Sequence, residues 1–132
     1  QGAGIHSSAG LLLDKRGNDK YSCSFGVSQG CGHDTGIGVL VNSYGNDTYR
    51  SILYSQGVGL EKGIGILADF SGNDSYHARD SNCQGISTPS KTEEIDSIGI
   101  LIDNQGEHDT FHDVIAEKVL EYRLNGGIIL NK

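Results

Sequence analysis

The sequence predicts an all-β fold, a parallel β-helix (β-solenoid) of about four coils with roughly 27 to 28 residues in each. Two recurring patterns carry this prediction. The tripeptide Gly-Asn-Asp begins at Gly17, Gly45 and Gly72, which are almost evenly spaced along the chain. Gln-Gly pairs keep the same spacing and begin at Gln1, Gln29, Gln56 and Gln84. Repeats of this length are typical of stacked architectures in which each unit packs on its neighbours.

The composition agrees with such a stack. The chain has 132 residues, which fits one domain, and 36% of them are hydrophobic. It contains 20 glycines, no Trp and no Met, so a single deep core would be difficult to build. A solenoid avoids that difficulty because each coil buries its inner face against the next coil.

Each unit contains three short extended segments separated by turn residues. The first follows Gln-Gly, the second is an apolar run such as Gly38–Asn42, and the third begins at a tyrosine. Gly-Asn-Asp separates the second from the third, since Gly and Asn tolerate positive φ and Asp bonds to nearby backbone. Three strands per coil favour the right-handed form, because a left-handed hexapeptide coil has only roughly 18 residues. Equivalent residues should then stack about 4.8 Å apart. The predicted aromatic ladder is Tyr21, Tyr49, Tyr76 and Phe111.

The repeats are predicted to span residues 1–112, with an insertion that forms a polar surface loop at about 88–96. The first unit is incomplete at Gln1, which indicates a trimmed form or a piece of a longer protein. Residues 113–132 break the pattern. Asp113 resembles a helix N-cap, residues 114–124 have helical apolar spacing, and residues 128–130 resemble a final strand. We therefore expect a C-terminal helical cap over the end of the stack.

Alternation along the apolar run predicts which face is buried. Ile37, Val39 and Val41 share one face, which we assign to the core. The opposite face carries a column of leucines that would lie outside the wall and need a cover. A neighbouring domain, another copy or the C-terminal segment could supply it. The predicted interface residues are Leu12, Leu40, Leu67 and Leu101.

Two acidic columns flank the Gly-Asn-Asp turn and are candidate calcium ligands. The first column holds the turn aspartates, Asp19, Asp47, Asp74 and Asp109. The second lies about five residues earlier and holds Asp14, Asp69 and Asp103, with Asn42 among them. Carboxylate oxygens are the ligands that Ca²⁺ prefers. The alternative is that each Asp caps the backbone of its own turn.

The segment Gly45-Asn46-Asp47-Thr48-Tyr49 resembles half of the calcium-binding nonapeptide repeats of secreted bacterial toxins and proteases. In that family, turn carbonyls and Asp carboxylates of adjacent coils hold Ca²⁺. The resemblance implies the same role for the turn aspartates and an extracellular or cell-surface bacterial protein. The present chain departs from the family because its motif recurs once per predicted coil, whereas the nonapeptide motif recurs twice per coil.

Charge and motif content narrow the function. A formal charge of −7 disfavours nucleic-acid partners, and no run of 18 apolar residues could span a membrane. The chain lacks H-E-x-x-H, G-x-S-x-G and phosphate-loop motifs. We therefore expect a structural or binding module, with a protein or glycan on a lateral face, rather than an enzyme. A small carbohydrate-active enzyme (polysaccharide lyase or hydrolase) and a self-assembling solenoid stay open. The three cysteines, Cys23, Cys31 and Cys83, are predicted to be small, partly buried residues or spare thiols, with a disulfide or thiol chemistry as the alternative.

Overall fold

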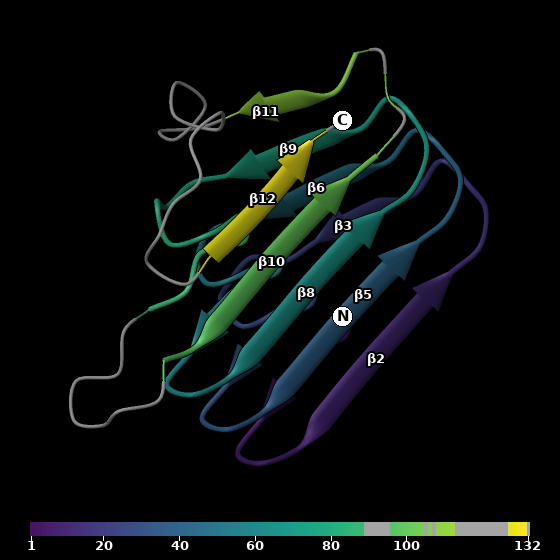
Figure 1. Cartoon of the computed structure of the whole chain (residues 1–132). Coiled ribbons are helices and arrows are strands. Elements are labelled where there is room, and N and C mark those ends of the chain that lie inside the picture. Colours follow the sequence, from purple (N-terminus) through teal and green to yellow (C-terminus); the bar gives the residue numbers. More distant parts are fainter. Residues whose placement is uncertain (89–95, 105, 107, 113–126, 132) are drawn as a thin grey trace.

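The structure, a computed structural model, describes residues 1–88, 96–104, 106, 108–112 and 127–131. Every strand pairing in it is parallel, so the predicted all-β class with parallel strands is confirmed (Figure 1). The described residues contain no helix, and hence none that is long and apolar enough to cross a membrane.

The strands form three sheets, and each of the first three sequence repeats contributes one strand to each sheet (Figure 1). The first sheet contains β1 (Gly4–Ile5), β4 (Gly32–His33) and β7 (Gly59–Leu60). The central sheet contains β2 (Ala9–Asp14), β5 (Ile37–Asn42), β8 (Ile64–Asp69), β10 (Ile98–Asp103) and β12 (Gly127–Asn131). The tyrosine sheet contains β3 (Lys20–Ser22), β6 (Thr48–Ser51), β9 (Ser75–Ala78) and β11 (Thr110–His112).

The strand register places equivalent residues of successive repeats side by side. Tyr21 pairs with Tyr49, Tyr49 with Tyr76, and Tyr76 with Phe111. Their rings stack in sequence, with centroid distances of 4.9, 4.8 and 4.7 Å and interplanar angles of 9°, 6° and 7°. The predicted aromatic ladder is therefore present, and it follows directly from the strand spacing of a parallel sheet.

Buried glutamines tie the tyrosine sheet to the Gln-Gly turns. The side-chain amide of Gln29 donates to the backbone carbonyls of Tyr21 and Arg50, at 3.0 and 2.9 Å. Gln56 repeats this one unit later, donating to the carbonyls of Tyr49 and His77. Each amide thus bridges two consecutive strands of the tyrosine sheet, which explains why the glutamine recurs with the period of the repeat.

The predicted inside and outside faces of the central sheet are reversed in the structure. Leu40, Leu67 and Leu101 are completely buried and pack against the tyrosine ladder, with Leu12 partly buried beside them. The leucine column is therefore core, and its assignment to an outer interface is wrong. The opposite face is the exposed one, where Leu13 is 64% exposed.

Narrow spacing between the sheets accounts for this reversal. A Cβ on Gly38 would collide with the backbone carbonyl of Cys31, and a Cβ on Gly65 would collide with that of Val58. The inward face must therefore carry glycine at these two positions, where another segment of the backbone passes close to the strand. The same face then offers room for one leucine layer and for the polar column that ends each strand. The face with more apolar residues is consequently the outer one.

Only some of the predictions for the C-terminal region fall on residues that the structure describes. The final strand expected at 128–130 is present as β12, which joins the central sheet beside β10. The helical cap predicted within 113–132 is not seen in the described part of the chain, since its helix falls on residues outside it. The insertion loop predicted at 88–96 also lies largely outside the described residues.

Candidate metal centre

The Gly-Asn-Asp turns link each repeat to its neighbours through two sets of side-chain hydrogen bonds. Asp47 accepts from the backbone N–H of Asp19 at 2.6 Å, and Asp74 accepts from the N–H of Asp47 at 2.7 Å. Asp109 accepts in the same way from the N–H of Asp74 at 2.9 Å. Each carboxylate therefore caps the turn of the preceding repeat, not the backbone of its own turn.

The asparagines of the same turns act in the opposite direction along the stack. Asn18 accepts from the N–H of Asn46, and Asn46 accepts from the N–H of Asn73, both at 2.9 Å. Glycine is required before them because a Cβ on Gly45 would collide with the carbonyl oxygen of Gly17. The whole tripeptide is thus explained as a connection between stacked turns, whether or not a cation is bound.

A second polar column closes the inward face of the central sheet. Strand register aligns Asp14, Asn42, Asp69 and Asp103, each the last residue of its strand. Tyrosine hydroxyls reach this column from the facing sheet. Tyr21 donates to Asp14 at 2.9 Å and Tyr49 donates to Asp69 at 2.6 Å. The tyrosine ladder therefore supplies packing and also a row of hydrogen-bond donors beside the carboxylates.

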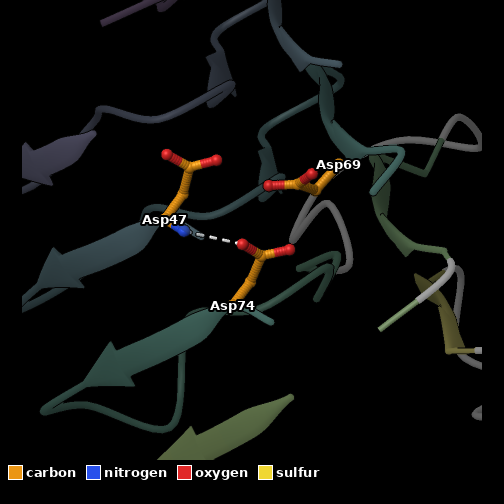
Figure 2. Close-up of side chains that lie close together, drawn as sticks. All are labelled: Asp47, Asp69 and Asp74. Carbon is orange, nitrogen blue, oxygen red and sulfur yellow. Dashed lines mark hydrogen bonds between the residues drawn. The ribbon is translucent and has the colours of Figure 1, made fainter. Parts of the chain in front are cut away.

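The two columns converge on one side of the molecule and form two clusters that could hold a metal ion. Figure 2 shows the first cluster, in which Asp69 ends β8 and Asp47 and Asp74 precede β6 and β9. The second cluster contains Asp74, Asp103 and Asp109. In each cluster the three contributed oxygens lie within 4.8 Å of one another. Ca²⁺–oxygen distances of about 2.3–2.6 Å place ligands on opposite sides of the ion at such separations.

Burial makes these clusters unusual for acidic turns. Asp69 is completely buried, and Asp47, Asp74 and Asp103 are each 1% exposed. Among the described residues, neither carboxylate oxygen of Asp103 has a hydrogen-bond partner, and Oδ2 of Asp74 also has none. Burying an ionised carboxylate without a donor or a cation costs several kcal/mol (about 1–3 kcal/mol even for a neutral polar group).

The carboxyl pKa values reflect burial and the repulsion between neighbouring carboxylates. Burial raises the pKa of Asp69 to about 6, although its bond from Tyr49 opposes the shift. Burial, with the nearby charge of Asp69, raises the pKa of Asp74 to about 7 against the bond from the Asp47 N–H. Burial and the charge of Asp109 raise the pKa of Asp103 to about 8. The nearby hydroxyl of Tyr76 opposes this last shift, although its geometry falls short of a hydrogen bond. Without a cation, Asp103 is therefore mostly protonated at neutral pH, Asp74 is partly protonated, and Asp69 is mostly ionised.

The second repeat satisfies its turn carboxylate in another way. Asn42 replaces aspartate in the inward column there, and its amide donates to Oδ2 of Asp47 at 2.8 Å. The same amide lies 3.3 and 3.2 Å from the hydroxyls of Tyr21 and Tyr49. In the second repeat, an amide donor thus lies beside the turn carboxylate, in the position where a cation would lie in the two aspartate clusters.

The structure brings together five of the seven aspartates predicted from the sequence. Asp14 and Asp19 belong to the first repeat, are partly exposed, and lie in neither cluster. Sequence reasoning missed the tyrosine hydroxyls and the amide of Asn42 as partners of the carboxylates. Their fixed spacing was a usable signal, because each tyrosine follows the inward polar residue by seven positions in the first three repeats.

No family model, curated protein or solved structure matched this chain in the comparisons.

Proposed function

We propose that this chain is a calcium-stabilised β-solenoid module with a structural or binding role, and that its two aspartate clusters bind two stacked Ca²⁺ ions. The observation that carries the proposal is the pair of buried carboxylates with unpartnered oxygens, Asp103 and Asp74, each within a cluster of three. The solenoid is supported by the order of the strands, because strands of successive repeats are parallel neighbours in each sheet.

Charge balance favours two divalent cations over protons alone. The two clusters share Asp74, so together they contain five carboxylates, Asp47, Asp69, Asp74, Asp103 and Asp109. Five negative charges against two divalent cations leave a net charge of −1. Each ion would also separate carboxylates that otherwise repel one another in a medium of low dielectric constant.

The ligand set favours calcium over magnesium. All the candidate ligands are oxygens, and carboxylates that bind through one or both oxygens suit the variable coordination of Ca²⁺. Mg²⁺ is smaller, demands octahedral geometry and retains several waters, which the first cluster, made entirely of buried side chains, accommodates poorly. Calcium sites of extracellular modules bind in the 10⁻⁴–10⁻³ M range, which fits the proposed secreted or surface location.

Calcium binding can be tested by thermal unfolding in EDTA and in millimolar Ca²⁺, with circular dichroism as the readout. We expect Ca²⁺ at about 10 mM to raise Tm by several degrees, because a ligand present at 10 to 100 times its Kd stabilises the folded state by about 1.4–2.7 kcal/mol per site. Asp74→Asn should abolish most of this increase, since Asp74 belongs to both clusters. Asparagine retains an oxygen that can accept from the Asp47 N–H, so the connection between turns survives.

Asp34→Asn is the matched control because Asp34 is 49% exposed and pairs with His6 outside the clusters. It should respond to Ca²⁺ as the unmodified chain does. Tyrosine-sensitised Tb³⁺ luminescence gives a second readout, since Tyr49 bonds directly to the proposed ligand Asp69. An equal Tm in EDTA and Ca²⁺, together with no sensitised emission, would contradict the proposal.

A further inference from the structure

The outer face of the central sheet is built from aliphatic side chains over its first four strands. Every outward position of β2, β5, β8 and β10 is Ala, Val, Leu or Ile. Leu11 and Leu13 are 63% and 64% exposed, and Ile37 and Ile98 are each 43% exposed. Exposed apolar surfaces of monomeric proteins rarely reach more than a few hundred Å² unless they mark an interaction site.

We infer that this aliphatic face, made of the outward residues of β2, β5, β8 and β10, is where a second copy of the chain binds, face to face, to form a closed dimer. The inference is independent of the cation sites, because the aspartates of the central sheet lie on its inward side. It also differs from an interface at the leucine column, which is buried.

The regularity of the face fits an identical partner. Strand register aligns Leu11 with Val39, Val39 with Ile66, and Ile66 with Ile100, so the side chains form straight rows along the stack. Rows at the spacing of strands, about 4.8 Å, match a second set of rows with the same spacing. Two such sheets can pack about 10 Å apart with their strands nearly aligned.

The size of the face fits a weak, reversible dimer. Its four strands of six residues cover about 19 by 20 Å, or about 380 Å² per copy, at ordinary strand spacing and rise. Two copies therefore bury about 760 Å² in total, which is less than the roughly 1,000 Å² of a stable interface, so we expect association only at high protein concentration.

Charge also favours this face over the others for self-association. The chain has a formal charge of −7, so two copies repel one another in general. Contact through the aliphatic face places no charged side chain of the described strands opposite another. A twofold axis would pass close to Ile66, at the middle outward position of the central strand β8.

Light scattering coupled to size exclusion, from micromolar to several hundred micromolar protein, tests the inference. We expect a concentration-dependent shift from the chain mass of 14.1 kDa to twice that mass. Ile66→Lys should shift the dissociation constant at least 100-fold towards monomer, since dimerisation would bury two lysines close to the twofold axis. Ile66→Leu should preserve the dimer.

Two further variants separate a lost interface from a lost fold. Leu11→Lys combined with Leu13→Lys alters only highly exposed side chains, so the circular dichroism spectrum should not change while dimerisation weakens. Thr48→Lys, on the outer face of the tyrosine sheet, should leave the dimer intact. A chain that is monomeric at all concentrations, a dimer unaffected by Ile66→Lys, or an assembly that grows beyond two copies would each overturn the inference.

Discussion

At the scale of single residues, the last residue of each central-sheet strand decides whether its repeat needs a cation. Asn42 and Asp69 occupy the same column, and each accompanies a turn aspartate of its own repeat. The amide of Asn42 adds no charge and donates a hydrogen bond to Asp47, whereas Asp69 adds a further carboxylate to the next repeat. The number of cation sites should therefore depend on the residue at this column.

Asn42→Asp should create a third calcium site from Asp19, Asp47 and the new carboxylate. In EDTA the variant should be less stable by about 1–3 kcal/mol, because it replaces the buried amide that donates to Asp47 by a further carboxylate. In Ca²⁺ most of this loss should be recovered. Isothermal titration calorimetry should then give a stoichiometry of three instead of two. A stoichiometry unchanged from that of the unmodified chain would refute this assignment of the column.

At the scale of the strand, alternation determines which substitutions the fold tolerates. Leu67 is completely buried in β8, whereas its neighbour Ile66 points outward and is only partly buried. We expect Leu67→Ala to lower the free energy of unfolding by about 2–5 kcal/mol, because it leaves a cavity against the tyrosine ladder. Ile66→Ala should cost well under half as much.

Urea unfolding of both variants, at a protein concentration at which the chain is monomeric, measures the difference. Comparable losses at the two positions would mean that the inward and outward faces are wrongly assigned. A loss at Ile66 that grows with protein concentration would instead report the dimer contact, because association stabilises the folded chain by mass action.

The strands and their register can be predicted from the sequence, because each repeat carries the same residues at the same spacing. The aromatic ladder from Tyr21 to Phe111 follows from that spacing alone. The buried face cannot be predicted in this way, because alternation does not say which of the two faces is inward. The more apolar face of Ile37–Asn42 is the outer one. The close approach at Gly38, which decides the question, involves backbone of another segment.

The composition of the aspartate clusters can be predicted from the sequence, whereas the surroundings of their carboxylates cannot. The acidic columns are visible in the sequence because they repeat, so all five aspartates of the two clusters can be named from it. The lack of hydrogen bonds to Asp103 depends on which side chains close over it, and that is a property of the packed structure. The same holds for the turn aspartates, whose bonds cross to the preceding repeat.

At the scale of the whole molecule, packing and charge oppose each other along the stack. Stacked tyrosines, leucines and glutamines repeat without penalty, because each new repeat adds the same favourable contacts. Repeated buried aspartates instead accumulate like charges, and every added level raises the cost of keeping them ionised. Without a cation, the thermal stability of the folded chain should therefore depend on pH through several carboxyls at once.

In EDTA, we expect Tm to fall as the pH rises from 5 to 9, the opposite of the usual response of carboxylate-bearing proteins. Asp69, Asp74 and Asp103 have folded-state pKa values of about 6, 7 and 8, whereas an unfolded aspartate titrates near 3.9. Between about pH 4 and pH 8 the folded chain therefore binds more protons than the unfolded chain. The free energy of unfolding consequently decreases as the pH rises through this window.

Calcium and a single substitution should each change this profile in a defined direction. Saturating Ca²⁺ should flatten the fall, because the cation replaces the protons and binds more tightly as the carboxyls ionise. Asp103→Asn in EDTA should make the fall shallower and remove it between about pH 7 and pH 8, where Asp103 is the last of the three carboxyls to lose its proton, while Asp34→Asn should leave the profile unchanged. Melting curves at unit pH intervals measure all three effects. A Tm in EDTA that rises between pH 5 and 9 would mean that these aspartates are ionised and well solvated in the folded chain, and the carboxylate clusters would then need no cation.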